Sequence, residues 1–146
     1  MMRSAVPVIL LAALVSASCA TTPTSTASDA VPAEFVGAGT PLPITTGDAF
    51  REAVVGRPLR LVSNDVRATL QFDADNTASG TVVRGDGESS DMSLDWVWEG
   101  TVYCRTGSVG GTVLTRKCEA VELVPGVGIR LSYVSGEDAE EYWVFR

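Results

Sequence analysis

The strongest constraint on the fold is a regular alternation of apolar and polar side chains that begins after residue 59. In residues 67–73, Ala68, Leu70 and Phe72 alternate with charged and polar side chains. Successive side chains of a β-strand point to opposite faces, so this pattern predicts a half-buried antiparallel strand. The same period of two returns several times before the last residue, which predicts an all-β domain.

Residues 92–105 show the alternation over the longest stretch. The even-numbered positions from Met92 to Cys104 carry its large apolar side chains, with Gly100 in between. We expect one long strand with a bulge or a sharp bend at the glycine. Turn-forming segments separate it from the neighbouring strands at 73–80, 85–91, 106–111, 125–126 and 135–138.

These strands and turns predict a meander of six to eight short antiparallel strands. Closing such a meander removes the unpaired edges of the sheet. A small antiparallel, lipocalin-like barrel is therefore the expected architecture, and an open sandwich is the alternative.

One helix is expected in this domain, over about residues 46–55. Thr45 with Asp48 resembles a capping box, and Phe50, Ala53 and Val54 fall on one helical face. A helix this short needs tertiary packing. We expect Phe50 to anchor it to the sheet, outside the barrel or plugging one end.

The first twenty residues have the pattern of an export signal. Arg3 precedes an apolar run at 5–15, which is too short to span a bilayer, and small residues follow up to Cys19 and Ala20. This pattern resembles the signal of bacterial lipoproteins, in which the cysteine is lipidated and becomes the new N-terminus. The resemblance departs at Ser16, where that family prefers leucine. Cleavage by ordinary signal peptidase after Ala17 or Ala20 is the alternative.

The lipoprotein resemblance implies three parts: a signal peptide at 1–18, the lipidated Cys19 with a flexible tether at 19–33, and a single β domain at 34–146. The tether is rich in Thr, Ser, Ala and Pro and has no large apolar residue before Val31. Ala20 after the cysteine follows the family's rule for the outer membrane. We therefore expect a membrane anchor and an outer-membrane protein that faces the periplasm; a secreted or free periplasmic protein is the alternative.

The chain has three cysteines. If Cys19 carries lipid, Cys104 and Cys118 remain as a pair in an oxidising compartment. A hairpin centred on Gly111 places them directly opposite each other, within the reach of a disulfide. Two unpaired buried cysteines are the alternative.

Catalytic and cofactor signatures are weak in this sequence. It has no histidine, which removes the commonest general base and metal ligand. Ser108 lacks the first glycine of a nucleophile elbow, and the loop from Asp73 departs from a calcium loop at Ala78 and Arg84. We predict no enzyme, no cofactor and no metal site. The net charge of −7 also argues against nucleic acid as a partner.

The candidate contact residues are aromatic and acidic. Trp96 and Trp98 share one face of the long strand, either as core or as the border of a ligand pocket. A second group combines carboxylates with aromatic rings, either as a contact for a partner or as a charged edge that deters aggregation; it comprises Glu137, Asp138, Glu140, Glu141, Tyr142 and Trp143.

Two further resemblances concern the domain itself. A helix followed by Trp96-x-Trp98, Tyr103-Cys104 and Cys118 resembles small uncharacterised exported proteins of alphaproteobacteria, expected to be β-barrels. Tyr133 to Gly136, followed by Tyr142-Trp143, faintly resembles the inhibitory loop of the membrane-bound inhibitors of C-type lysozyme. That family presents a serine and a basic residue where this chain has Glu137 and Asp138.

Three functional hypotheses follow. The first is a non-catalytic envelope lipoprotein with a structural or assembly-related role. The second is a binder or inhibitor of a cationic envelope enzyme such as lysozyme. The third is a carrier of a small apolar ligand, which requires a cavity beside Trp96 and Trp98.

Overall fold

The computed structural model describes residues 31–134 and 140–146. The predicted signal peptide at 1–18, Cys19 and nearly all of the tether lie outside the described residues. Glu137 and Asp138 lie outside them as well. Within the described part, no helix is both long and apolar enough to cross a membrane.

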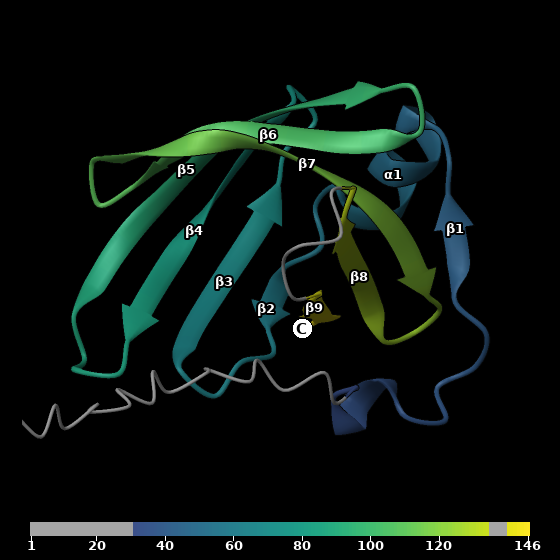
Figure 1. Ribbon diagram of the computed structural model, residues 1–146, viewed down its shortest axis with the longest axis horizontal. Coiled ribbons are helices and arrows are strands. Elements are labelled where there is room, and N and C mark those ends of the chain that lie inside the picture. Colours follow the sequence, from purple (N-terminus) through teal and green to yellow (C-terminus); the bar gives the residue numbers. More distant parts are fainter. Residues whose placement is uncertain (1–30, 135–139) are drawn as a thin grey trace, which may run out of the picture.

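The described residues form nine strands and one α-helix (Figure 1). The strands are β1 (Leu42–Ile44), β2 (Leu59–Leu61), β3 (Val66–Phe72), β4 (Thr77–Arg84), β5 (Ser89–Glu99), β6 (Val102–Val109), β7 (Thr112–Val124), β8 (Gly128–Tyr133) and β9 (Glu141–Phe145). The helix α1 spans Gly47–Val54 and is preceded by a short 3-10 turn at Ala33–Phe35.

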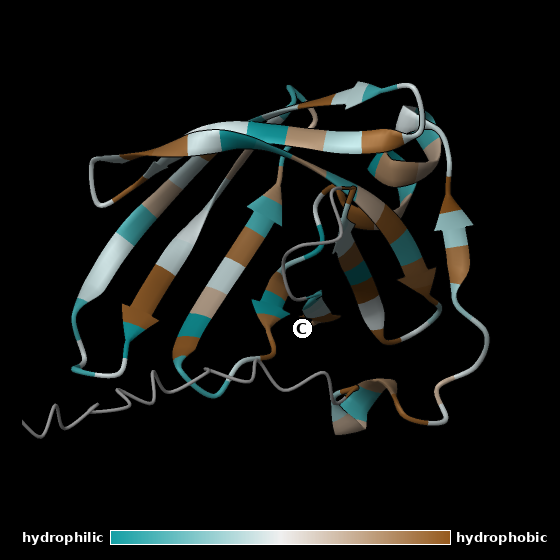
Figure 2. Ribbon diagram, in the orientation of Figure 1, coloured by the Kyte–Doolittle hydropathy of each residue, from teal (hydrophilic) through white to brown (hydrophobic). Residues whose placement is uncertain are grey.

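Strands β2 to β9 close into an antiparallel barrel, which confirms the predicted fold. β3 to β8 pair in sequence order, and the circle closes because β9 pairs with β8 on one side and with β2 on the other. β1 is an extra strand that pairs with the end of β7. The alternating bands of colour along the strands in Figure 2 follow the division between an apolar interior and a more polar exterior.

The helix plugs one end of the barrel. Thr46 caps it by accepting a hydrogen bond from the backbone N–H of Ala49, so the cap lies one residue after the predicted Thr45. Phe50, Ala53 and Val54 are its buried residues, as the helical spacing predicts. The helix therefore sits as a stopper, with Phe50 pointing into the barrel.

The predicted long strand at 92–105 is wrong, because the chain turns at Gly100. β5 ends at Glu99 and β6 begins at Val102, and Gly100 adopts a φ of 60°, which glycine tolerates without steric cost. Because of this hairpin, the even-numbered residues of β5 share a face with the odd-numbered residues of β6. Trp98 lies opposite Tyr103, so Tyr103 points into the barrel and Cys104 points outward.

The next hairpin is tighter than the predicted loop at 106–111. β6 continues to Val109, and Gly110 and Gly111 alone form the turn. The register shifts by one residue between Arg105 and Gly107, and this bulge restores Cys104 opposite Cys118. A side chain at Gly107 would place its Cβ 2.1 Å from the carbonyl oxygen of Ser93, so the close approach of β5 requires glycine here.

A small second core lies on the outer face of the barrel. Phe35 packs edge to face against Tyr142, with ring centroids 4.9 Å apart, and Val124 and Val144 complete the cluster. The segment before β1 thus covers the outside of β9, and it fixes the N-terminal part of the described chain to the barrel wall.

Candidate functional site

The two candidate tryptophans belong to an aromatic cluster around Phe50. The Phe50 ring is fully buried and lies 5.1 Å from Trp96 and 5.5 Å from Trp98 between ring centroids. Phe72 and Tyr103 complete this cluster at 5.2 and 5.0 Å from Phe50. The space beside the tryptophans is therefore occupied by the helix, as core packing requires.

Hydrogen bonds fix both indole rings in this position. The Nε1–H of Trp96 donates to the carbonyl oxygen of Thr77 at 3.2 Å, and that of Trp98 donates to Gly100 at 3.0 Å. Buried indole groups need such partners, because an unpaired N–H in a dry interior is costly. Both indole N–H groups are therefore used within the fold itself.

The predicted disulfide between Cys104 and Cys118 is present on the outer face of β6 and β7. The two residues are directly opposed, and their sulfur atoms are 2.08 Å apart. Among the described residues, Glu99 comes close enough to form a metal-ligand triplet with the two sulfurs, all within 4.8 Å. Both sulfurs are used in the disulfide, and Glu99 pairs with Arg116. We therefore assign a cross-linking role to this pair.

Four charged side chains meet inside the barrel, and we call them the ion cluster: Arg105, Lys117, Glu119 and Glu141. Arg105 and Lys117 lie directly opposite each other on β6 and β7. Like charges in such a position repel each other, so they need carboxylates nearby. Glu119 from β7 and Glu141 from β9 supply them.

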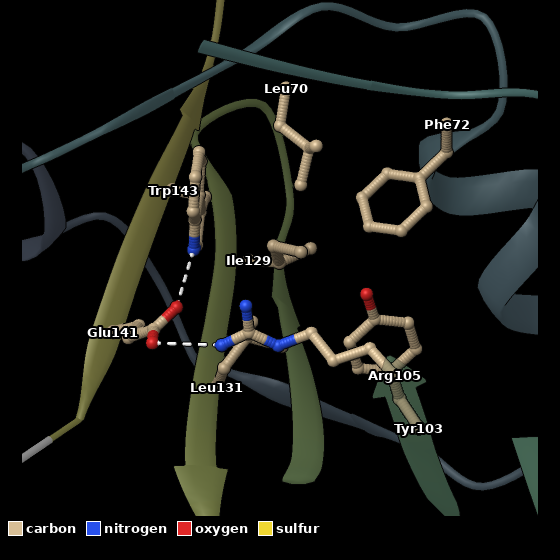
Figure 3. A pocket seen from close by; sticks show the side chains of 8 residues that line it. All are labelled: Leu70, Phe72, Tyr103, Arg105, Ile129, Leu131, Glu141 and Trp143. Atoms are coloured by element: carbon tan, nitrogen blue, oxygen red, sulfur yellow. Dashed lines mark hydrogen bonds and ion pairs between the residues drawn. The ribbon is translucent and has the colours of Figure 1, made fainter. Parts of the chain in front are cut away.

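Arg105 is the central member of the ion cluster. Its Nε donates to Glu119 Oε2 at 3.0 Å, and its Nη2 donates to Glu141 Oε1 at 3.0 Å, as Figure 3 shows for the second contact. Lys117 Nζ lies 3.2 Å from Glu141 Oε1 and 3.3 Å from the centroid of the Tyr133 ring. Two cations therefore face two carboxylates in the interior.

The two carboxylates have opposite pKa shifts. Burial raises the pKa of Glu119, against the attraction of Arg105, because no part of this residue reaches solvent. For Glu141, burial acts in the same direction, but the attraction of Arg105 and of Lys117 outweighs it and lowers the pKa. Of the two carboxylates, Glu141 is therefore the one that its surroundings favour in the charged form.

The ion cluster separates two spaces inside the barrel. Toward the helix lies a space of about 10 Å³, bordered by Leu70, Phe72, Ile129, Leu131 and Trp143 (Figure 3). The buried hydroxyl of Tyr103 borders it and has no hydrogen-bond partner among the described residues. On the other side lies a cavity of about 300 Å³. Arg105 and Glu141 border both spaces.

The predicted acidic and aromatic group around residue 140 is divided between the two faces of β9. Glu141 and Trp143 point into the barrel, where the Trp143 Nε1–H donates to Glu141 Oε2 at 3.1 Å. Glu140 and Tyr142 lie on the outer side and bond to each other through the tyrosine hydroxyl. These four residues therefore form no continuous surface. The strand alternation separates them.

Sequence reasoning missed Arg105, Lys117 and Glu119 as interior residues. A signal was available, because these residues flank the opposed cysteines on both strands and so share the face that the cysteines do not use. Reading that face as the interior required the turn at Gly100. The long-strand prediction instead placed Cys104 inside.

Comparison with protein-family models, with curated proteins and with solved structures gives no match for this chain.

Proposed function

We propose that this chain is an exported lipoprotein of the bacterial envelope, anchored through Cys19, with a non-catalytic binding or assembly role. The observation that carries the proposal is the disulfide between Cys104 and Cys118, which joins β6 and β7. Disulfides persist in oxidising compartments, so this bridge supports an extracytoplasmic location. It also accounts for two of the three cysteines and leaves Cys19 for the anchor.

The interior chemistry supports a role without catalysis. Glu119 and Glu141 are both neutralised by Arg105 and Lys117 at distances of 3.0 to 3.8 Å. The aromatic cluster fills the end of the barrel at the helix. Such groups stabilise and position the barrel wall, so the proposed role depends on the surface of the domain and on the cavity beside the ion cluster.

Metabolic labelling with an alkyne fatty acid tests the anchor directly. We expect label on the wild-type protein and on the Cys104→Ser variant, and none on Cys19→Ser. The mass of the processed protein should begin at Cys19 with added acyl groups. A mature chain that begins after Ala17 or Ala20 without lipid would show cleavage by ordinary signal peptidase and overturn the anchor. The outer-membrane location is tested by fractionating the same cells.

A second candidate function, binding of a cationic envelope protein, is favoured by the outer face of β5. Asp91 and Asp95 are exposed on this face, and no described basic side chain forms an ion pair with either. The neighbouring outward positions, such as Ser93, Ser79 and Thr106, are uncharged. This surface offers carboxylates to a basic partner, whereas Glu141 is already paired inside the barrel.

A lysozyme turbidity assay tests this second function. If β5 contacts the enzyme, the purified domain should slow lysis at low salt, and the effect should fade as salt screens the charges. An Asp91→Asn, Asp95→Asn double variant should lose it, and Asp86→Asn, in the exposed loop before β5, serves as the control. Undiminished lysis with several C-type lysozymes would remove this candidate.

A further inference from the structure

The cavity beside the ion cluster, as the described residues border it, has the size and the lining of a small ligand site. Its volume of about 300 Å³ lies at the lower end of the range for small-molecule pockets. Met92, Val109 and Leu114 line its wall, and they come from the adjacent strands β5, β6 and β7. The ion cluster borders its inner end. The exposed Thr106 and Thr115 form its rim. The cavity therefore has one apolar wall, two threonines at its rim and charged side chains at its base.

The base of the cavity has hydrogen-bond donors to spare and few free acceptors. Glu141 already accepts from four groups: Arg105, Lys117 and Tyr133 at Oε1, and Trp143 at Oε2. Each carboxylate oxygen offers two lone-pair positions, so Oε1 is fully used and Oε2 keeps one. A further molecule at this point can thus bind to donors more readily than to Glu141.

Lys117 is the donor most available to a ligand. Its ammonium group carries three N–H bonds and makes one hydrogen bond among the described residues, to Glu141. Glu119 lies 3.8 Å from Lys117 Nζ, beyond hydrogen-bond distance. The side chain of Lys117 is 29% exposed, against 14% for Arg105 and 0% for Glu119. Exposure thus favours the lysine over the deeper ions.

We propose that this cavity binds a slender amphiphile with a carboxylate headgroup. Lys117, with Arg105 behind it, donates hydrogen bonds to the carboxylate, and the alkyl chain lies along Met92, Val109 and Leu114. Long-range attraction does not supply this preference, because the chain is net negative. Short-range, charge-assisted hydrogen bonds at the base and apolar burial along the wall supply it.

This site differs from the cavity that the sequence predicts beside Trp96 and Trp98. Phe50 occupies that end, whereas the cavity lies on the opposite side of the ion cluster. The inference adds a ligand to the envelope role and does not depend on lipidation of Cys19. A failure of one proposal therefore leaves the other standing.

Calorimetric titration with three ten-carbon probes tests the site. The full chain carrying Cys19→Ser serves as the protein, because it needs no detergent that would compete for the cavity. We expect decanoate to bind at least tenfold more tightly than decanol or decylamine. Equal affinities for the three probes, or no binding of decanoate, would overturn the proposal.

Two variants locate the binding on the barrel. Lys117→Met should weaken decanoate binding at least tenfold, because the headgroup loses its accessible cation. Leu114→Trp should abolish binding by filling the cavity while leaving every ion in place. Val113→Trp is the matched control, since Val113 is next to Leu114 in sequence but is 82% exposed and outside the cavity lining.

Near-ultraviolet circular dichroism establishes that each variant is folded before titration. If Lys117→Met does not fold, Leu114→Trp decides the question alone. Decanoate binding that survives Leu114→Trp, or that is lost equally in Val113→Trp, would contradict the assigned site.

Discussion

The two ends of the barrel interior use opposite chemistry on the same strands. Near the helix, Phe50 contacts Trp96 and Tyr103, and the space is filled by rings. Two residues farther along β6, Arg105 lies opposite Trp96 and begins the ion cluster. Aromatic rings fill the interior at the end near the helix. At the charged end, ion pairs link the strands and border a cavity.

The two ends are expected to contribute to the free energy of unfolding in different ways. Each buried aromatic ring stabilises the fold through its own apolar burial and its contacts, largely independently of the other rings. Buried ions stabilise only as a set, because any unpaired member is costly. We therefore expect truncations at the aromatic end to be costly singly, and changes at the charged end to be strongly coupled.

The largest expected loss comes from Phe50→Ala at the aromatic end. Removing a fully buried phenyl ring in contact with four aromatic neighbours should cost about 5 kcal/mol of unfolding free energy. Urea denaturation measures it. Phe35→Ala in the outer cluster, where the ring is 9% exposed, is the control and should cost less. Equal losses would mean that the helix does not act as the stopper.

Arg105→Met should be the most costly change at the charged end, at about 4 kcal/mol. It leaves Glu119 buried without its closest cation. The double variant Arg105→Met, Glu119→Gln should recover a large part of this loss, because no uncompensated charge remains at that point. A double variant that is less stable than Arg105→Met would contradict the coupling that distinguishes this end.

Cys104→Ser should cost about 3 kcal/mol, because the bridge closes a segment with a sequence separation of 14. The bridge also joins the two strands that carry Arg105, Lys117 and Glu119. The melting temperature in oxidising buffer should fall by several degrees, and Cys118→Ser should lower it by the same amount. An unchanged melting curve would mean that the strands are held together without the disulfide.

Glu141→Gln should have a smaller effect that depends on pH, at about 2 kcal/mol near pH 7. The pKa of Glu141 is lowered in the folded protein by Arg105 and Lys117, against the effect of burial. Its charge therefore stabilises the fold above the ordinary glutamate pKa of about 4.3, and this contribution is lost as the pH falls through the lowered value. The gap to wild type should close in acid.

Glu119→Gln should change the unfolding free energy at pH 7 in the opposite direction to Glu141→Gln. Burial raises the pKa of Glu119, so its protonated form is favoured in the fold, and wild type loses this contribution as the pH rises through the raised pKa. The glutamine variant should be at least as stable as wild type at pH 7 and converge with it in acid. A variant that is markedly less stable at pH 7 would contradict the assigned direction.

The amino-acid sequence by itself determined the local features of this protein. Alternation at 67–73 specified β3, and the face formed by Phe50, Ala53 and Val54 specified a helix that matches α1 within one or two residues. The spacing of Cys104 and Cys118 around Gly111 placed the disulfide correctly. These features depend on residues close in sequence, for which periodicity and turn chemistry are sufficient.

Only the tertiary structure decided which face of β6 is the interior. Because the chain turns at Gly100 and does not merely bend, the odd-numbered residues of β6 face the interior, and Tyr103 and Arg105 lie inside. The ion cluster then required β7 and β9 to pair with β8 on its two sides, which brings Glu119 and Glu141 from separate strands to Arg105. A carboxylate becomes an interior residue through its long-range strand partners, because its own neighbours in sequence specify alternation but not which side is closed.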